Sequence, residues 1–165
     1  MSYDVTFQRC GISALFDLKG AVDAVEAWVG DALPDFPDRP NYRTGKDGKE
    51  LFFIGRDHWL ARAPLEQEVA LEARLKPTDC PVDISIVRVS DTTTFFRVTG
   101  PDAGEILAIA CPLDLHDSMF DAEAVTYTEV FGLKALVMRC KDGIEFGVEQ
   151  SFADMIEEYL SRATA

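Results

Sequence analysis

The sequence predicts an α+β protein in which a mostly antiparallel sheet is packed by helices. Several short runs alternate apolar with polar residues, which is typical of strands that bury one face. Other runs place apolar residues at helical spacing, as in helices that bury one side. These strands and helices follow one another in groups of unequal size and do not alternate strictly. Such an order favours a mostly antiparallel sheet. The chain has 165 residues, the size of one ordinary domain, so we expect a single domain over residues 1–165.

The first third of the chain predicts short strands, one helix and a long loop. Val5–Leu18 holds two apolar runs broken at Gly11, so we expect two short strands there. Ala21–Val29 has an apolar face at helical spacing, and Gly30 can end this helix because glycine accepts a left-handed conformation. Asp31–Glu50 is rich in Pro, Gly and Asp and is expected to be a surface loop.

The middle of the chain predicts a pair of strands, a helix and a further strand. Leu51–Ile54 and His58–Ala63 are expected strands joined by a Gly-Arg-Asp turn. Leu65–Leu75 is an expected helix that ends before a proline. Val82–Val89 is apolar and β-branched, and its alternation slips near Ile86, which indicates a bulge there.

A strand over Phe95–Thr99 is expected to lead directly into a short helix. Gly100 can serve as the N-cap, and Pro101 stands at the first helical position, where its missing N–H costs nothing. Pro112 disfavours the helical conformation at Cys111 and should therefore end the helix.

The last quarter of the chain predicts three strands and a terminal helix. Lys141, Asp142 and Gly143 make a good hairpin connection between the second and third of these strands. Ser151 is the expected N-cap of the helix, whose apolar stripe runs to Leu160. The expected strands are Val125–Phe131, Leu133–Cys140 and Ile144–Val148.

The charge balance is strongly acidic, with 29 Asp and Glu against 16 Lys and Arg and a formal net charge of −13. Nucleic-acid binding depends on basic side chains that neutralise phosphates, so this balance argues against a nucleic-acid partner or an anionic membrane surface. Two interpretations stay open. The acids form an ordinary solvated surface, which composition alone favours, or some of them form a face that meets a basic partner.

The N-terminal residues contain no signal-peptide pattern, and no window approaches the ~18 apolar residues that a membrane span requires. We therefore expect a cytoplasmic protein without a membrane partner. The four cysteines are far apart in the sequence and form no CxxC pair, so we expect separate buried thiols in a reducing compartment: Cys10, Cys80, Cys111 and Cys140.

Patterns that carry chemistry are scarce in this sequence. It has no P-loop, GxGxxG, HExxH or GxSxG motif. His58 precedes Trp59 at a strand start and is interpreted as a packing or solvent-facing residue. Asp17 and Asp91 are interpreted as turn or cap residues.

His116 allows two interpretations. It can pair with Asp114 as an acid–histidine pair or part of a metal site, or it can take part in local hydrogen bonds that hold the turn after the helix. We favour the local bonds because no further metal ligand is arranged around the pair. Cys111 would lie at the C-terminal end of a helix, where the dipole disfavours a thiolate, so a small buried residue is the better interpretation. We predict no catalytic and no metal-binding residue in this chain.

Four segments in order resemble the gamma subunit of heterotetrameric sarcosine oxidase, and the likeness covers nearly the whole chain. The most specific element is CPLDLH, which follows the GPDA turn after one short helix, and it is joined by a SFAD cap ahead of the last helix. The segments are Ala14–Gly20, Ile54–Pro64, Arg88–Leu115 and Gln150–Leu160.

This family is similar in fold to the folate-binding domain of the glycine-cleavage T-protein, so the resemblance implies that fold here. T-proteins carry an essential carboxylate in a Gly-Gly-x-x-Asp-Asp stretch that follows a Tyr-containing strand. The corresponding stretch here is Thr126–Arg139, and around Ala135 and Leu136 it offers Lys134 and apolar residues but no Asp. A side chain at that position cannot accept a proton from a folate amine.

The resemblance implies a non-catalytic subunit of a flavoenzyme that oxidatively demethylates sarcosine to glycine and passes the one-carbon unit to formaldehyde or tetrahydrofolate. FAD, covalent FMN, NAD and tetrahydrofolate would belong to the large alpha and beta subunits and zinc to the small delta subunit, with none bound by this chain. Its role would be assembly and stability of the large subunits. Besides the loop Asp31–Glu50, the segment expected to contact them is Cys111, Pro112, Leu113, Asp114, Leu115 and His116.

Three alternatives remain from the sequence. The chain can be the similar small subunit of an N-methylglutamate dehydrogenase, so the amino-acid substrate is open. It can be a free-standing folate-dependent aminomethyltransferase or demethylase, which would require a pocket with a carboxylate placed for a pterin or an amine. It can also be a regulator built on the same fold.

Overall fold

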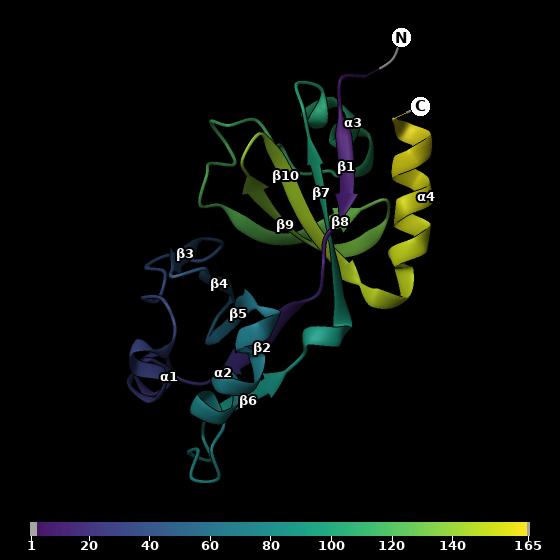
Figure 1. Cartoon of the computed structure of the whole chain (residues 1–165). Helices are drawn as coiled ribbons and strands as arrows, with labels where there is room; N and C mark the ends of the chain where they lie inside the picture. The colour runs from purple at the N-terminus through teal and green to yellow at the C-terminus, as the bar shows by residue number, and fades with distance from the viewer. Residues whose placement is uncertain (1–2, 165) are drawn as a thin grey trace. The chain divides into compact units, whose positions relative to one another are not determined.

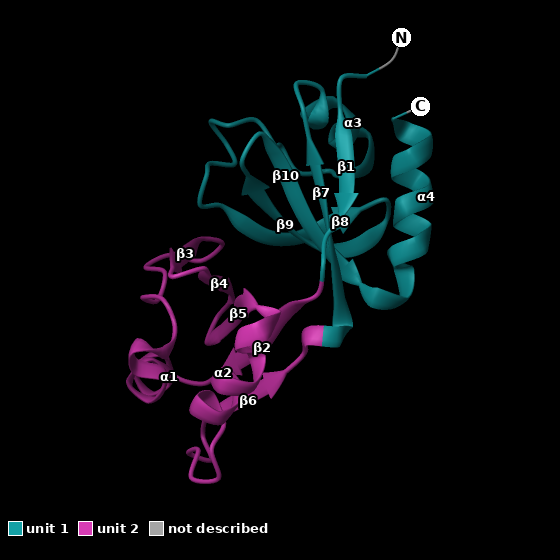
Figure 2. Ribbon diagram, viewed as in Figure 1, with its two compact units in different colours: residues 1–11, 91–165 teal, residues 12–90 magenta. Residues whose placement is uncertain are grey.

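The computed structural model describes residues 3–164, which form two compact units (Figures 1 and 2). Unit 1 combines residues 3–11 with residues 91–164, and unit 2 is the continuous stretch Ile12–Ser90. Each unit has its own antiparallel sheet and its own hydrophobic cluster. The predicted α+β class with mostly antiparallel pairing is confirmed. The expectation of a single domain stays a prediction, because compactness does not measure whether the two units unfold together.

Unit 1 is built on a five-stranded antiparallel sheet in the order β1-β7-β10-β9-β8. Its last three strands follow one another in the chain, whereas β1 pairs with a strand that lies more than eighty residues further along. The strands predicted for this part are confirmed to within two residues at each end. The observed bounds are β1 Thr6–Arg9, β7 Thr93–Thr99, β8 Val125–Val130, β9 Leu133–Cys140 and β10 Gly143–Glu149.

Two helices, α3 (Ala103–Ala110) and α4 (Ala153–Ala163), pack on one face of this sheet. Alternate residues of the strands point to that face, and the stacked rings of Phe96 and Phe146, 5.7 Å apart, lie in the middle of it. The helices contribute small and branched side chains to the same cluster, which include Leu107 from α3 and Ile156 from α4. Burial of these apolar side chains is the main stabilising term of the unit.

Both predicted N-caps in unit 1 are wrong. Gly100 has φ +120° and lies in the turn before α3, where a Cβ would meet the carbonyl oxygen of Asp4 at 2.4 Å. The helix therefore begins two residues later, and Asp102 occupies the N-cap. Ser151 lies in a short 3-10 turn, Gln150–Phe152, and its hydroxyl donates to the Glu149 carboxylate instead of capping α4. The predicted stop at Pro112 is confirmed, since Cys111 is extended.

Unit 2 also has a five-stranded antiparallel sheet, in the order β3-β4-β5-β2-β6. Helices α1 (Val22–Val29) and α2 (Glu68–Leu75) pack on one face of it and share a hydrophobic cluster with Phe16, Trp59 and Ile86. Short 3-10 turns cover Gly30–Ala32, Leu65–Gln67 and Ser90–Thr92. The strand bounds are β2 Ser13–Lys19, β3 Arg43–Lys46, β4 Lys49–Gly55, β5 His58–Pro64 and β6 Ser85–Arg88.

Two expectations for unit 2 need correction. The predicted loop Asp31–Glu50 contains the strand β3, which pairs with β4 through a hairpin whose turn residues, Asp47 and Gly48, both have positive φ. An Asp-Gly pair is a strong turn signal of this kind, and the Pro- and Gly-rich composition of the stretch concealed it. The bulge predicted near Ile86 is absent, because β6 pairs with β2 without a break. The observed register shift lies in β4, between Phe53 and Gly55.

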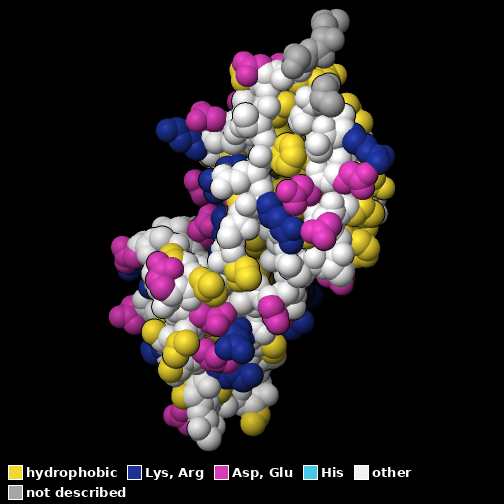
Figure 3. All heavy atoms as spheres, turned by 45° about the vertical axis from the view of Figure 1, so that its right-hand side comes forward, with side chains coloured by type: hydrophobic (Ala, Val, Ile, Leu, Met, Phe, Trp, Pro, Cys, Tyr) yellow, Lys and Arg dark blue, Asp and Glu magenta, His cyan; other side chains and the backbone are white. Residues whose placement is uncertain are grey.

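The structure can be compared with two predictions from composition, one on the distribution of acidic side chains and one on membrane-spanning helices. On the face that Figure 3 shows, acidic side chains are interspersed with basic and hydrophobic ones instead of forming a single-sign patch. Over residues 3–164, none of the helices combines the length and the apolar character that a bilayer crossing requires.

Gly143 and Gly104 give a matched pair of tests for the packing of unit 1. A Cβ at Gly143 would meet the Val98 carbonyl oxygen at 2.0 Å, whereas a Cβ at Gly104 in α3 would meet nothing within 4 Å. We expect Gly143→Ala to lower the free energy of unfolding by about 2 kcal/mol or more through strain. Gly104→Ala should raise it by about 0.5–1 kcal/mol, the usual helix gain. Urea denaturation measures both, and equal effects of the two substitutions would contradict the close strand packing.

The single-domain prediction has a direct optical test, because both tryptophans, Trp28 and Trp59, lie in unit 2. Tryptophan fluorescence therefore reports the unfolding of unit 2, while far-ultraviolet circular dichroism reports both units. A single domain should give coincident urea transitions by the two probes. Two separate midpoints would instead show that the units unfold independently.

Candidate functional site

A surface groove of unit 1 contains the whole of the segment that the sequence singled out. It has a volume of about 1200 Å³ and is lined by the start of α3, by the segment that follows that helix, and by the β9–β10 hairpin. All six residues Cys111–His116 line it. Pro112 directs the chain out of the helix and into this extended segment, so the groove wall follows from the helix stop that the sequence predicted.

Arg139 on β9 holds the outer part of this segment in place. Its guanidinium donates to the carbonyl oxygen of Phe120 from both Nε, at 3.2 Å, and Nη2, at 2.9 Å. It also donates to the carbonyl oxygen of Leu115 and forms an ion pair with Asp117 at 3.0 Å. One side chain therefore fixes both ends of residues 115–120. This role could not be predicted from the sequence, because Arg139 is about twenty residues away, on the strand β9.

His116 takes part in local hydrogen bonds, as the favoured interpretation held. Its backbone N–H donates to the Asp114 carboxylate at 3.0 Å, so that carboxylate faces the main chain instead of the imidazole ring. The backbone N–H of Ser118 donates to Nδ1 at 3.2 Å, and the Ser118 hydroxyl oxygen lies 2.8 Å from the same atom. Because a backbone N–H only donates, Nδ1 is an acceptor, and the proton of the neutral ring is on Nε2.

The charged side chains that line the groove are mainly acidic. Four carboxylates line it, from Glu105, Asp114, Asp117 and Asp142, against the single guanidinium of Arg139. Such a surface favours a basic group on whatever binds there. Within the described part of the chain, no three His, Cys, Asp or Glu side chains come together in a way that could hold a metal ion.

The four cysteines are separate and form no disulfide with one another, but only one of them is buried as predicted. Cys111 is 5% exposed at the end of α3, and the other three are partly exposed: Cys10, Cys80 and Cys140. Cys111 belongs to the hydrophobic cluster of unit 1, so the interpretation as a small buried residue is confirmed.

Unit 2 holds a carboxylate–histidine contact that the sequence did not reveal. Asp17 lies in the middle of β2 instead of at a turn, and its Oδ1 contacts Nε2 of His58 on β5. Lys19 Nζ lies 3.2 Å from the other oxygen of the same carboxylate. The antiparallel register, which pairs Lys19 with His58, brings these side chains to one face. Only knowledge that these two strands are neighbours would have revealed the contact.

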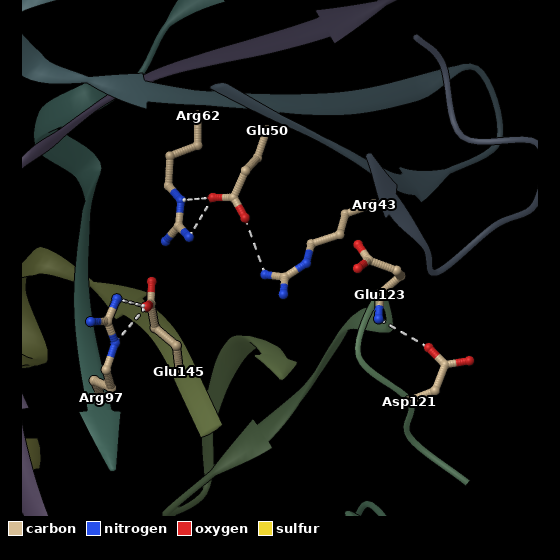
Figure 4. Close-up of polar contacts among 7 residues, drawn as sticks. All are labelled: Arg43, Glu50, Arg62, Arg97, Asp121, Glu123 and Glu145. Carbon is tan, nitrogen blue, oxygen red and sulfur yellow. Dashed lines mark hydrogen bonds and ion pairs between the residues drawn. The ribbon is translucent and has the colours of Figure 1, made fainter. Parts of the chain in front are cut away.

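Other acidic side chains in both sheets are engaged in ion pairs between strands (Figure 4). In unit 2, Glu50 accepts from Arg62 at 2.7 Å and from Arg43 at 3.2 Å. In unit 1, the buried Glu145 accepts from Arg97, its partner in the strand register, at 2.6 Å and 3.1 Å. The hydrogen bond to Glu145, followed by its charge, raises the pKa of Arg97. These carboxylates stabilise the sheets, because each balances a cation next to it.

The stretch Thr126–Arg139, which the resemblance relates to the acid-bearing segment of T-proteins, forms most of β8 and β9. Ala135 and Leu136 are fully buried there, and the neighbouring Lys134 is exposed. Lys134 Nζ lies 4.5 Å from the ring centre of Tyr127 on β8, which is a cation–π contact. This part of β9 therefore presents apolar side chains and a cation, and no carboxylate.

Comparison with known proteins agrees with this geometry. One chain of the heterotetrameric sarcosine oxidase from Corynebacterium sp. U-96, solved in complex with pyrrole 2-carboxylate, superposes with a TM-score of 0.81 at 20% sequence identity. The match covers 97% of this chain and 83% of that chain. The glycine cleavage system aminomethyltransferase T from Bartonella henselae superposes with a TM-score of 0.67 at 17% identity over 96% of this chain, which spans 46% of that protein's chain.

At these identities the two structures show a shared fold. No curated protein matches the chain. The family model described as sarcosine oxidase, gamma subunit family, matches residues 43–165, which is well over half of the chain. The resemblance expected from CPLDLH and the neighbouring segments is confirmed: this chain belongs to the sarcosine oxidase gamma subunit family.

Proposed function

We propose that this chain is the gamma subunit of a heterotetrameric complex that oxidatively demethylates sarcosine to glycine and transfers the one-carbon unit to formaldehyde or tetrahydrofolate. The observation that carries the proposal is the family match over residues 43–165. The similarity of 97% of the chain to a chain of a heterotetrameric sarcosine oxidase supports it.

In this proposal the chain assembles and stabilises the large subunits and supplies no catalytic residue. Two features support that role. The stretch that would carry the acid of a T-protein presents Lys134, Ala135 and Leu136. Buried or partly buried carboxylates such as Glu50 and Glu145 are engaged by arginines within their own sheets. FAD, FMN, NAD and tetrahydrofolate would belong to the alpha and beta subunits and zinc to the delta subunit.

The docking surface in this proposal is the groove wall formed by Cys111–His116. Leu113 and Leu115 are partly buried and pack against the cluster of unit 1, and Asp114, which stands between them in the sequence, is exposed. Arg139 holds the adjoining loop in one shape, so little conformational freedom would be lost when a partner binds. A preorganised surface binds more tightly because this entropy cost is already met by folding.

The T-protein-like fold favours one rival, a free-standing folate-dependent aminomethyltransferase or demethylase. That activity would need a folate pocket with a carboxylate aimed at the reacting amine. A second rival keeps the subunit role but changes the substrate, since the chain could serve an N-methylglutamate dehydrogenase. Adjacent genes for two large flavin-bearing subunits and a small cysteine-containing one would support a complex of the sarcosine oxidase type.

Co-expression tests the assembly role. Expressed alone, the chain should self-associate or be poorly soluble, because the surface that contacts the large subunits is exposed. Co-expressed with the alpha, beta and delta subunits and purified through a tag on this chain, it should recover flavin-bearing partners in equal amounts, measured by gel densitometry and flavin absorbance.

Two outcomes would contradict the assembly role. One is a stable monomer that recovers no flavin protein. The other is binding of tetrahydrofolate by the isolated chain in calorimetry, together with turnover by that chain alone, which would favour the free-standing enzyme.

Arg139→Met tests whether the groove wall must be held in place. The substitution removes the donors to the carbonyl oxygens of Leu115 and Phe120, which should cost about 1–3 kcal/mol of unfolding free energy. We expect amide exchange at Met119 and Phe120 to rise at least about tenfold and recovery of the large subunits to fall. The control is Lys141→Met, which removes a cation from the same hairpin outside the contact. If Arg139→Met showed the same amide exchange and the same recovery of the large subunits as this control, Arg139 would not hold the segment in place.

A further inference from the structure

Unit 2 contains a second cavity, lined by aromatic side chains, that lies outside the groove already described. It lies between α1, the loop of residues 33–42 and the β4–β5 turn, and has a volume of about 570 Å³. Phe36, Phe53 and Trp59 line it, together with Val22 and two prolines. Its size is typical of pockets that bind a small group.

The aromatic rings form a corner. The ring centres of Phe36 and Trp59 are 5.1 Å apart with their planes at 69°, and Phe53 lies 5.5 Å from Trp59 at 32°. Aromatic faces carry partial negative charge and attract cations, most strongly tryptophan. A guanidinium is planar and weakly hydrated, so it stacks on such rings more readily than a lysine ammonium does.

Carboxylates predominate at the same cavity. Glu26, Asp38 and Asp57 line it against the single cation of Arg56, whose Nε lies 3.7 Å from the Asp57 carboxylate. Glu26 on α1 and Asp38 in the loop are both exposed. The chain as a whole has a net charge of −13. The charge of the cavity therefore complements a cation and disfavours an anion.

The indole of Trp59 supplies an independent sign of a missing partner. Trp59 is 1% exposed, and its Nε1–H is the one buried side-chain donor without a hydrogen-bond partner among the described residues. Trp28, the other tryptophan, donates to the carbonyl oxygen of Leu75 at 2.8 Å. A buried indole N–H usually has an acceptor, so the lining of this cavity includes a residue with an unsatisfied donor.

We propose that this cavity binds an arginine side chain presented by a peptide segment of a partner subunit. The guanidinium stacks on the partly exposed rings of Phe36 and Phe53, which pack on Trp59, and pairs with the carboxylates of Glu26 and Asp38. The inference rests on the proposed function, which supplies the partner. This contact would add to the groove contact instead of replacing it.

The test reverses the charge of two exposed lining residues, Glu26→Lys with Asp38→Lys. The matched control is Asp79→Lys with Asp83→Lys, which makes the same change in net charge at exposed acids of unit 2 outside both the cavity and the loop Asp31–Glu50. Circular dichroism and urea midpoints should show both double variants folded like the wild type. The measured quantity is affinity for the co-purified alpha and beta subunits, with amide exchange of residues 34–41 in the free and assembled chain as the second readout.

The cavity variant should bind the large subunits at least about tenfold more weakly than the control variant, because a guanidinium would then face two ammonium groups. Residues 34–41 should gain exchange protection on assembly of the wild-type chain. If the wild type itself recovers no large subunit, the proposed function fails. If the wild type assembles but the two double variants bind alike, or residues 34–41 gain no protection, only the cavity proposal is overturned. The cavity proposal would also be overturned if the wild-type chain alone self-associates and the cavity variant does not. The cavity would then bind a second copy of the chain instead of a partner subunit.

Discussion

The pairing of β1 with β7 is the constraint on which the architecture of this chain depends. It joins Thr6 to Thr99 and Arg9 to Phe96, so residues near the start of the chain complete a sheet whose other strands come from its second half. β7 is hydrogen-bonded along both edges, to β1 and to β10, and therefore joins the N-terminal strand to the strands from the second half of the chain. Unit 2 is then an insertion that leaves the first sheet after β1 and returns to it before β7.

Within each unit, features that depend on neighbouring residues in the chain could be predicted from the sequence, whereas features that depend on distant residues could not. The period of apolar residues locates most strands and helices, because burial of one face is a property of each segment alone. Gly30 and Pro112 mark helix ends by backbone geometry, and both predictions are correct. Gly100 and Ser151 are assigned wrongly as caps because their true roles depend on neighbours in space: the backbone at Asp4 for Gly100 and the Glu149 carboxylate for Ser151.

The same distinction between local and distant features applies to the candidate sites. CPLDLH is visible in the sequence as a motif, and the structure places all of it on one groove. The side chain that shapes the groove, Arg139, could not be identified, since nothing in the residues around it indicates that it reaches the carbonyl oxygens of Leu115 and Phe120. The Asp17–His58 contact was missed for a similar reason, because it requires the register between β2 and β5. Predicting such contacts needs strand neighbours, which one sequence does not specify.

The insertion has a consequence for how the chain is made. Unit 2 is complete once the ribosome has added Ser90 and its residues have left the exit tunnel, so it can fold while the rest is still being synthesised. β1 cannot form its strand pairing at that stage. Its hydrogen-bonding partner is translated some eighty residues later, which at roughly 5–20 residues per second is a wait of several seconds. During that time the backbone edge of β1 is unpaired, and a chaperone or an early-arriving partner would have its best opportunity to engage the nascent polypeptide there.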